Sequence, residues 1–174
     1  MNSSNGNENS NQHTLAESIT ISGVGIHSGH SVTMILEPAD PNTGIVFQRT
    51  DLKDQPTVKA DVDFVVETNR STTLSNNGAT VNTVEHLLAA FVGCEVDNVL
   101  VKIDGPEIPI LDGSSRPYVE AIEKVGRLKQ NAIKTWYSID HNIYFLDENK
   151  KVEMVAMPST DYRINTLIDF NSPV

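Results

Sequence analysis

The sequence predicts an α+β fold, and three observations support this. Runs rich in β-forming residues, bounded by Gly, Pro, Asn and Asp, occupy most of residues 15–82. Two segments with helical signals follow, at residues 83–93 and 116–125. Strand-like runs then return after residue 130. We therefore expect a first α+β domain at residues 14–130 and the start of a second at residues 131–174.

The first domain opens with β-structure. The expected strands lie in "LAESITISG", "SVTMILEP", "TGIVFQRT" and "TVKADVDFVV". The segment "TTLSNNGATVN" reads as a hairpin, because Asn77-Gly78 is a strong signal for a tight turn.

The first expected helix is "TVEHLLAAFVG", residues 83–93. Apolar residues recur at i, i+3, i+4 and i+7, and further apolar residues fill the remaining surface, so the helix should be largely buried. These positions are Val84, Leu87, Leu88 and Phe91, and the further apolar residues are Ala89 and Val92. Asn82 and Glu85 have the spacing of a capping box, which places the helix start at Asn82.

The second expected helix is "RPYVEAIEKV", after the strand "VDNVLVKI" and a loop with two prolines. Ser115 is the expected N-cap, Pro117 lies in the first turn, and Gly126 comes just past the end. Asp112, in "LDGSS", is expected to form a turn.

After "GRLKQNA", strands are expected in "TWYSIDHNIYFL", "KVEMVAM" and the alternating "YRINTLIDF". With no further helix to cover them, they read as a domain that is cut short. The segments "VTMILEP" and "VEMVAMP" share Val, Met, an aliphatic residue and Pro at equal offsets. Either the first half recurs in the second, or the match is coincidental.

Composition excludes several classes of protein. A net charge of −10 with scattered Lys and Arg argues against a nucleic-acid partner. The single cysteine, Cys94, excludes an internal disulfide, and no apolar run approaches a transmembrane segment. We expect a soluble, cytoplasmic protein. The Asn/Ser-rich residues 1–13 form an expected disordered tail without a secretory signal.

Glu85 and His86 carry the clearest chemical signal, because a helix this apolar rarely bears adjacent polar residues. Glu85 could simply meet the positive end of the helix dipole, and His86 could be a core residue. The same position also suits a metal site, because the dipole keeps His86 neutral and able to ligate. The segment lacks the second histidine of H-E-x-x-H, so a catalytic zinc would need ligands from elsewhere.

His27 lies in "GVGIHSG", where two glycines expose backbone amides. The segment precedes a strand and lacks a third glycine, so a dinucleotide site is a weak interpretation and a tight turn a better one.

Five segments together resemble one enzyme family, the UDP-3-O-acyl-N-acetylglucosamine deacetylases. They are "GVGIHSG", "EPADPNTGIVFQRTD", "TVEHLLAA", "DNVLVKIDGPEIPILDGSSRPYV" and "LIDFNSP". The similarity runs from about Thr14 to Val174, in order and at consistent spacing, and looks most like the Bacteroidetes-type versions.

The resemblance implies two similar α+β domains. The first would hold a mostly antiparallel sheet with two helices on one face, and the initial strands of the second would follow. It maps the general base onto Glu85 and one zinc ligand onto His86, with Zn²⁺ as the cofactor. The family's other ligands, in an H-x-x-x-D helix, and a later catalytic histidine have no counterpart here. His27 is expected near the substrate cleft, without an assigned role.

The implied reaction is hydrolysis of the N-acetyl group of UDP-3-O-acyl-N-acetylglucosamine. It gives acetate and UDP-3-O-acyl-glucosamine in the biosynthesis of lipid A, the anchor of lipopolysaccharide. Fusion to a 3-hydroxyacyl-carrier-protein dehydratase is a further implied feature. The competing hypothesis is a stand-alone domain that binds a sugar nucleotide or a protein and performs no chemistry.

Overall fold

A computed structural model describes residues 11–168, and the chain divides into two compact units, with the boundary in the sequence after Lys134. The first unit contains two α-helices among its described residues, α1 (Glu85–Gly93) and α2 (Arg116–Val125). Its strands are β1 (Asn11–Leu15), β2 (Ile19–Val24), β3 (Ser31–Pro38), β4 (Ile45–Arg49), β5 (Thr57–Lys59), β6 (Val65–Glu67), β7 (Thr73–Asn76), β8 (Ala79–Val81), β9 (Val99–Ile103) and β10 (Arg127–Ile133). The second unit contains β11 (Ile143–Asp147) and β12 (Val152–Ala156).

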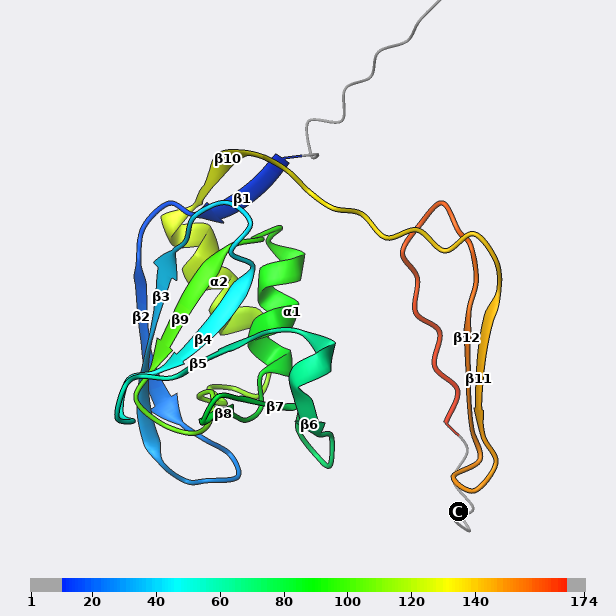
Figure 1. The fold of residues 1–174 in the computed structure, drawn as a ribbon, viewed down its shortest axis with the longest axis horizontal. Coiled ribbons are helices and arrows are strands. Elements are labelled where there is room, and N and C mark those ends of the chain that lie inside the picture. Colours follow the sequence, from blue (N-terminus) through cyan, green and yellow to red (C-terminus); the bar gives the residue numbers. More distant parts are fainter. Residues whose placement is uncertain (1–10, 169–174) are drawn as a thin grey trace, which may run out of the picture. The chain divides into compact units, whose positions relative to one another are not determined.

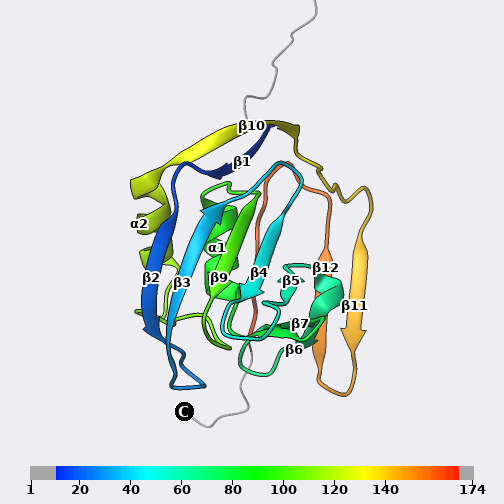
Figure 2. The same cartoon turned by 60° about the vertical axis from the view of Figure 1, so that its left-hand side comes forward.

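The central sheet has five strands in the order β2-β3-β9-β4-β5, and only β4 and β9 run parallel. Apolar residues alternate along β3 and β9, so that Met34 faces Ile103 and Leu36 faces Val101 on one buried face. Both helices pack on that face (Figures 1 and 2). The prediction of a mostly antiparallel sheet with two helices on one face is therefore confirmed.

The core lies between this sheet face and the two helices. The sheet contributes Phe47 from β4 and Val101 from β9, both fully buried. The helices contribute Phe91 from α1 and Tyr118 from α2, which are also fully buried. Burial of apolar surface at about 25 cal/mol per Å² makes this layer the main source of stability.

A smaller sheet, β6-β7-β8, contains the predicted hairpin. Asn77 and Gly78 have φ values of 49° and 84°, as a type I′ turn requires, and the strands pair on either side of them. Arg49 of β4 joins this sheet to the central one, because its Nη1 donates to the carbonyl of Thr80 at 2.6 Å.

The first strand corrects the predicted tail. Residues 1–10 lie outside the described residues, but Asn11–Leu15 forms β1 and pairs antiparallel with β10. Gln12 accepts a hydrogen bond from Asn98 and donates to the carbonyl of Ile133. Residues 11–13 therefore belong to the first unit, whose boundary lies at Lys134 rather than at residue 130.

The start of α1 also differs from the prediction. Asn82 is not the N-cap, because its backbone pairs with Pro106 and Ile108 and its side chain accepts from Thr73. The helix begins at Glu85, with Val84 at the N-cap and no side-chain cap. A smaller part of the helix surface is buried than predicted, since Ala89 is exposed and Val92 is 77% exposed.

The second helix follows its predicted bounds, Arg116–Val125, with Ser115 at the N-cap position and Gly126 at the C-cap position. The Ser115 side chain makes no capping bond, and the hydroxyl of Ser114 accepts from the backbone N–H of Arg116 instead. Gly126 has a φ of 78°, which explains the glycine at this end.

The second unit, described by itself, is an antiparallel hairpin of β11 and β12. The segment "VEMVA" forms β12, the second strand of its pair, and "VTMILEP" likewise lies in β3, the second strand of the β2-β3 pair. The strand expected in "YRINTLIDF" is absent from its described part, residues 162–168, and residues 169–170 lie outside the described range. Residues 162–168 pair with no other strand of the described chain, and an unpaired segment is not a strand.

Candidate functional site

The candidate site is the N-terminal end of α1, where Glu85 and His86 are the first two helical residues. Both side chains are half-buried, whereas Leu87 beside them is fully buried in the core. The core contact fixes the helix, and the two polar residues lie at the boundary between core and solvent. Neighbouring helical residues point about 100° apart, so the two side chains leave the helix in different directions.

The Glu85 carboxylate is held in place by the backbone. Its Oε2 accepts a hydrogen bond of 2.9 Å from the N–H of Thr72, which precedes β7. The other oxygen, Oε1, has no hydrogen-bond partner among residues 11–168 in the structure. One oxygen is therefore anchored, and the other is available to accept a further hydrogen bond.

The segment before α1 has an unusual backbone. Thr83 is 3% exposed and has a φ of 60°, a conformation that is uncommon and strained for a β-branched residue. Its hydroxyl donates to Oε1 of Glu107 at 2.9 Å. The strained residue therefore lies two positions before Glu85 and is bound to a buried carboxylate.

The same carboxylate binds the loop that carries His27. Glu107 is fully buried, and its Oε1 accepts from the N–H of His27 at 3.0 Å. Its Oε2 accepts from the N–H of Ser28 at 2.7 Å. Burial by itself would raise the pKa of Glu107, but the hydrogen bonds from Ser28, His27 and Thr83 outweigh it and lower the pKa. We call the set of Glu107, Thr83, His27 and Ser28 the Glu107 clamp.

The loop around His27 is a tight turn, as the sequence indicated. The N–H of Gly25 donates to His30 at 3.0 Å, and the N–H of Gly29 donates to Gly25 at 3.0 Å. The backbone N–H of His27 is bound to Glu107, while its side chain is exposed. The clamp thus joins the His27 loop to the segment that leads into Glu85 and His86.

Sequence reasoning did not identify Glu107. It lies in "GPEIP", between two prolines, a pattern that indicates a loop and gives no local sign of burial. Its backbone forms an isolated bridge with Asn82, and the hydrogen bonds to His27 and Ser28 span 80 and 79 residues. Asp112 in the same loop has its predicted role, since its Oδ1 accepts from the backbone N–H of Ser114.

The described side chains supply only part of a metal site. Residues 11–168 contain no cluster of three or more His, Cys, Asp or Glu side chains that could hold a metal ion. His86, half-buried at a positive helix end, fits the role of a single imidazole ligand. A catalytic zinc takes about three protein ligands, so the described residues hold at most part of such a site.

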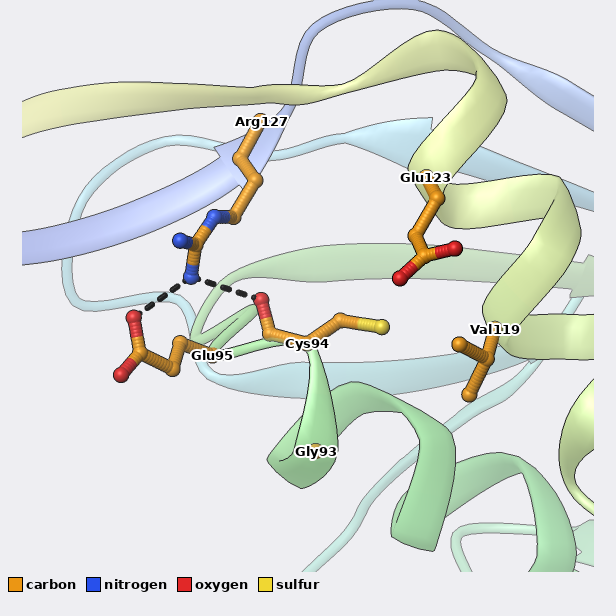
Figure 3. A pocket seen from close by; sticks show the side chains of 6 residues that line it. All are labelled: Gly93, Cys94, Glu95, Val119, Glu123 and Arg127. Carbon is orange, nitrogen blue, oxygen red and sulfur yellow. Dashed lines mark hydrogen bonds and ion pairs between the residues drawn. The ribbon is translucent and has the colours of Figure 1, made fainter.

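A hollow of about 660 Å³ lies at the C-terminal end of α1, away from Glu85 and His86 (Figure 3). It is lined by Gly93, Cys94, Glu95, Val119, Glu123 and Arg127. Arg127 donates to the carbonyl of Cys94 and to Glu95, and burial together with Glu123 raises the pKa of the Cys94 thiol. The thiol is therefore kept protonated, and this hollow is not part of the candidate site.

Among residues 11–168 there is no helix with the length and apolar character needed to cross a membrane.

Residues 12–174 match the family described as UDP-3-O-acyl N-acetylglycosamine deacetylase, LpxC. The chain is 43% identical over 163 residues to the bifunctional enzyme LpxC/FabZ of Bacteroides thetaiotaomicron, covering 94% of this chain and 35% of that protein. It is 43% identical over 164 residues to the UDP-3-O-acyl-N-acetylglucosamine deacetylase of Myxococcus xanthus, covering 94% of this chain and 52% of that protein. The chain thus spans about a third to a half of the length of these relatives. On the extent of the match, the chain belongs to the UDP-3-O-acyl N-acetylglycosamine deacetylase family.

Proposed function

We propose that the protein containing this chain hydrolyses the N-acetyl group of UDP-3-O-acyl-N-acetylglucosamine. The products are acetate and UDP-3-O-acyl-glucosamine, an intermediate of lipid A biosynthesis. The observation that carries the proposal is the Glu85-His86 pair at the start of α1, with one oxygen of Glu85 anchored by Thr72. The family match and the names of the relatives support the choice of substrate.

Glu85 is the general base in this proposal. Amide hydrolysis by water needs a group that removes a proton from the water as it attacks the carbonyl carbon. Because the carboxylate is anchored through one oxygen, its orientation is fixed before the substrate binds, which favours a productive geometry. The proton that Glu85 takes is then available to the amine that leaves as the C–N bond breaks.

His86 is one ligand of a zinc ion in this proposal, and further ligands come from outside the described residues. When bound, zinc supplies Lewis acidity toward the carbonyl oxygen. The role of His86 itself is to present an imidazole nitrogen from the first turn of α1. His27 contributes to binding of the substrate from its exposed position on the clamped loop.

The relatives from Bacteroides thetaiotaomicron and Chlorobaculum tepidum are named as bifunctional LpxC/FabZ enzymes. We propose that the gene product here carries the same kind of fusion, with a 3-hydroxyacyl-carrier-protein dehydratase. We also propose that it acts in the cytoplasm, where a nucleotide-linked sugar is available.

Release of acetate from the UDP-sugar by the complete gene product tests the proposal. Glu85→Gln keeps the size of the side chain and an oxygen that can accept from Thr72, but removes the base. We expect turnover to fall by roughly 10²–10⁴-fold with the zinc retained. The matched control is Glu120→Gln, an exposed glutamate of α2 that pairs with Arg116, and it should leave turnover unchanged.

Near-normal turnover of Glu85→Gln at saturating substrate, with zinc bound, would exclude the base assignment. A wild-type protein that binds the UDP-sugar but releases no acetate would favour the competing hypothesis of a binding domain without catalysis.

A further inference from the structure

Glu107 is the charged residue that the proposed mechanism does not use, although it is fully buried. Burying a carboxylate is unfavourable unless donors replace the water that it loses. Hydrogen-bond donors do so here: the N–H groups of His27 and Ser28 and the hydroxyl of Thr83, together with the side chain of Ser28. An apolar residue could fill the same space without needing hydrogen-bond donors. The presence of a carboxylate and its hydrogen bonds at this position therefore needs an explanation.

The bonds join two specific segments. One is the turn that presents His27, and the other is the strained residue that leads into α1. Asn82, next to Thr83, is bound on both sides to the strand-like segment that contains Glu107, through Pro106 and Ile108. The backbone before Thr83 is therefore fixed, and the Glu107 bond stabilises the positive φ of Thr83.

The packing around the carboxylate is equally close. A Cβ added at Gly25 would lie 2.3 Å from Oε2 of Glu107 and 2.5 Å from the hydroxyl of Ser28. The loop thus approaches the carboxylate so closely that only glycine fits at position 25. Movement of Glu107 would move both the loop and the start of the helix.

We propose that Glu107 is a positioning residue, which sets the locations of Glu85 and His86 relative to the His27 loop through its bonds to Thr83, His27 and Ser28. This inference rests on the proposed function, because it assigns the clamp to the deacetylase site. Glu107 does not touch the reacting atoms. It acts by holding the start of α1 in the conformation that directs the base and the ligand.

The clearest variant is Glu107→Gln in the complete gene product. The amide keeps the shape of the side chain but places an N–H₂ group against a donor, so at least one clamp bond is lost. We expect kcat to fall by roughly 10–100-fold with little change in KM, as when groups that orient a metal ligand or base are altered. Zinc content per folded protein should fall as well.

A second pair of variants examines the other end of the clamp. Thr83→Val keeps the branched shape and removes the hydroxyl, whereas Thr83→Ser keeps the hydroxyl. Thr83→Val should lower kcat, as Glu107→Gln does. Thr83→Ser should keep most of the wild-type kcat. In the Glu107→Gln background, Thr83→Val should add little, because the bond is already broken.

Hydrogen exchange provides a readout that does not depend on activity. In Glu107→Gln we expect faster exchange confined to residues 24–29 and 82–88. Ile122→Val is the control, since it shortens a buried side chain of α2 and lies outside the clamp. It should lower overall stability without faster exchange in those two segments and without loss of kcat per folded molecule.

The outcomes separate the two proposals. If the wild type is active and Glu85→Gln is inactive, but Glu107→Gln keeps kcat and zinc, the positioning role is wrong and the proposed function stands. If hydrogen exchange rises uniformly along the chain in both Glu107→Gln and Ile122→Val, Glu107 does not specifically hold the two segments in place, and the positioning role is wrong. If the wild type releases no acetate, the proposed function fails. The hydrogen-exchange measurement does not depend on activity, so its result cannot be mistaken for this failure.

Discussion

Thr83 and Glu107 are joined by a hydrogen bond of 2.9 Å between two side chains that are 3% and 0% exposed. The bond stabilises a threonine at positive φ, two residues before the proposed catalytic base. Strained backbone of this kind persists where surrounding contacts over-determine it, and it is common near functional sites. The start of α1 is therefore determined by tertiary contacts rather than by a local capping box.

We predict that His86→Ala lowers the zinc content of the complete gene product. Loss of one of about three protein ligands weakens binding, and activity should fall in parallel. Metal analysis after dialysis measures this. Glu85→Gln should keep its zinc in the same assay, and stoichiometric zinc in His86→Ala would remove His86 from the ligand set.

We predict that Gly25→Ala destabilises the 174-residue chain. The added Cβ would lie 2.3 Å from the Glu107 carboxylate, so the loop or the carboxylate must move and clamp bonds are lost. Overpacking of this kind costs about 1–3 kcal/mol, measurable by urea unfolding. Gly93→Ala, which meets nothing within 4 Å, is the control and should be neutral or slightly stabilising. Equal effects of the two variants would contradict the steric argument.

We predict that Tyr118→Phe lowers the free energy of unfolding by about 1–3 kcal/mol. Tyr118 is fully buried, and its hydroxyl donates to the carbonyl of Pro109 in the loop that contains Glu107. Removing the hydroxyl leaves that carbonyl without its partner. The control is Tyr137→Phe, at a residue 96% exposed, where we expect a change within about 0.5 kcal/mol.

We predict that His13 makes the chain less stable as the pH falls below about 6.5. Its side chain is 12% exposed and its Nδ1 lies 3.9 Å from Asp97 Oδ2, a carboxylate that Lys134 also approaches at 3.3 Å. Burial is the largest effect and lowers the pKa of His13. Arg127 and Lys134 lower it further, and Asp97 and Glu95 oppose them.

The sign follows from proton linkage. With a lowered folded-state pKa, the unfolded chain binds more protons over the interval below its value of 6.5. The contribution of His13 to stability is therefore complete above pH 6.5 and is lost as the pH falls through the folded-state pKa. Urea unfolding between pH 8 and pH 5 should show a smaller decline in His13→Gln than in the wild type, with His30→Gln as the control. Parallel curves for the wild type and His13→Gln would refute the assignment.

Local sequence signals located much of the first unit. The hairpin at Asn77-Gly78 and the bounds of α2 depend on residues close together in the chain, and both were predicted. Glu85 and His86 were also identified from sequence as adjacent polar residues on an apolar helix, and their roles stay predictions.

Only the tertiary structure decided the remaining features. Residues 127–133 form a strand because β1, more than a hundred residues earlier, is there to pair with them. Glu107 looked like an ordinary loop residue because its burial arises only when segments about 80 residues apart meet around it. Sequence by itself predicted which residues carry the chemistry and determined which turns are possible, since these depend on side-chain type and local backbone preference. The fold decided where α1 starts and what holds its first turn, because those depend on hydrogen bonds between distant segments.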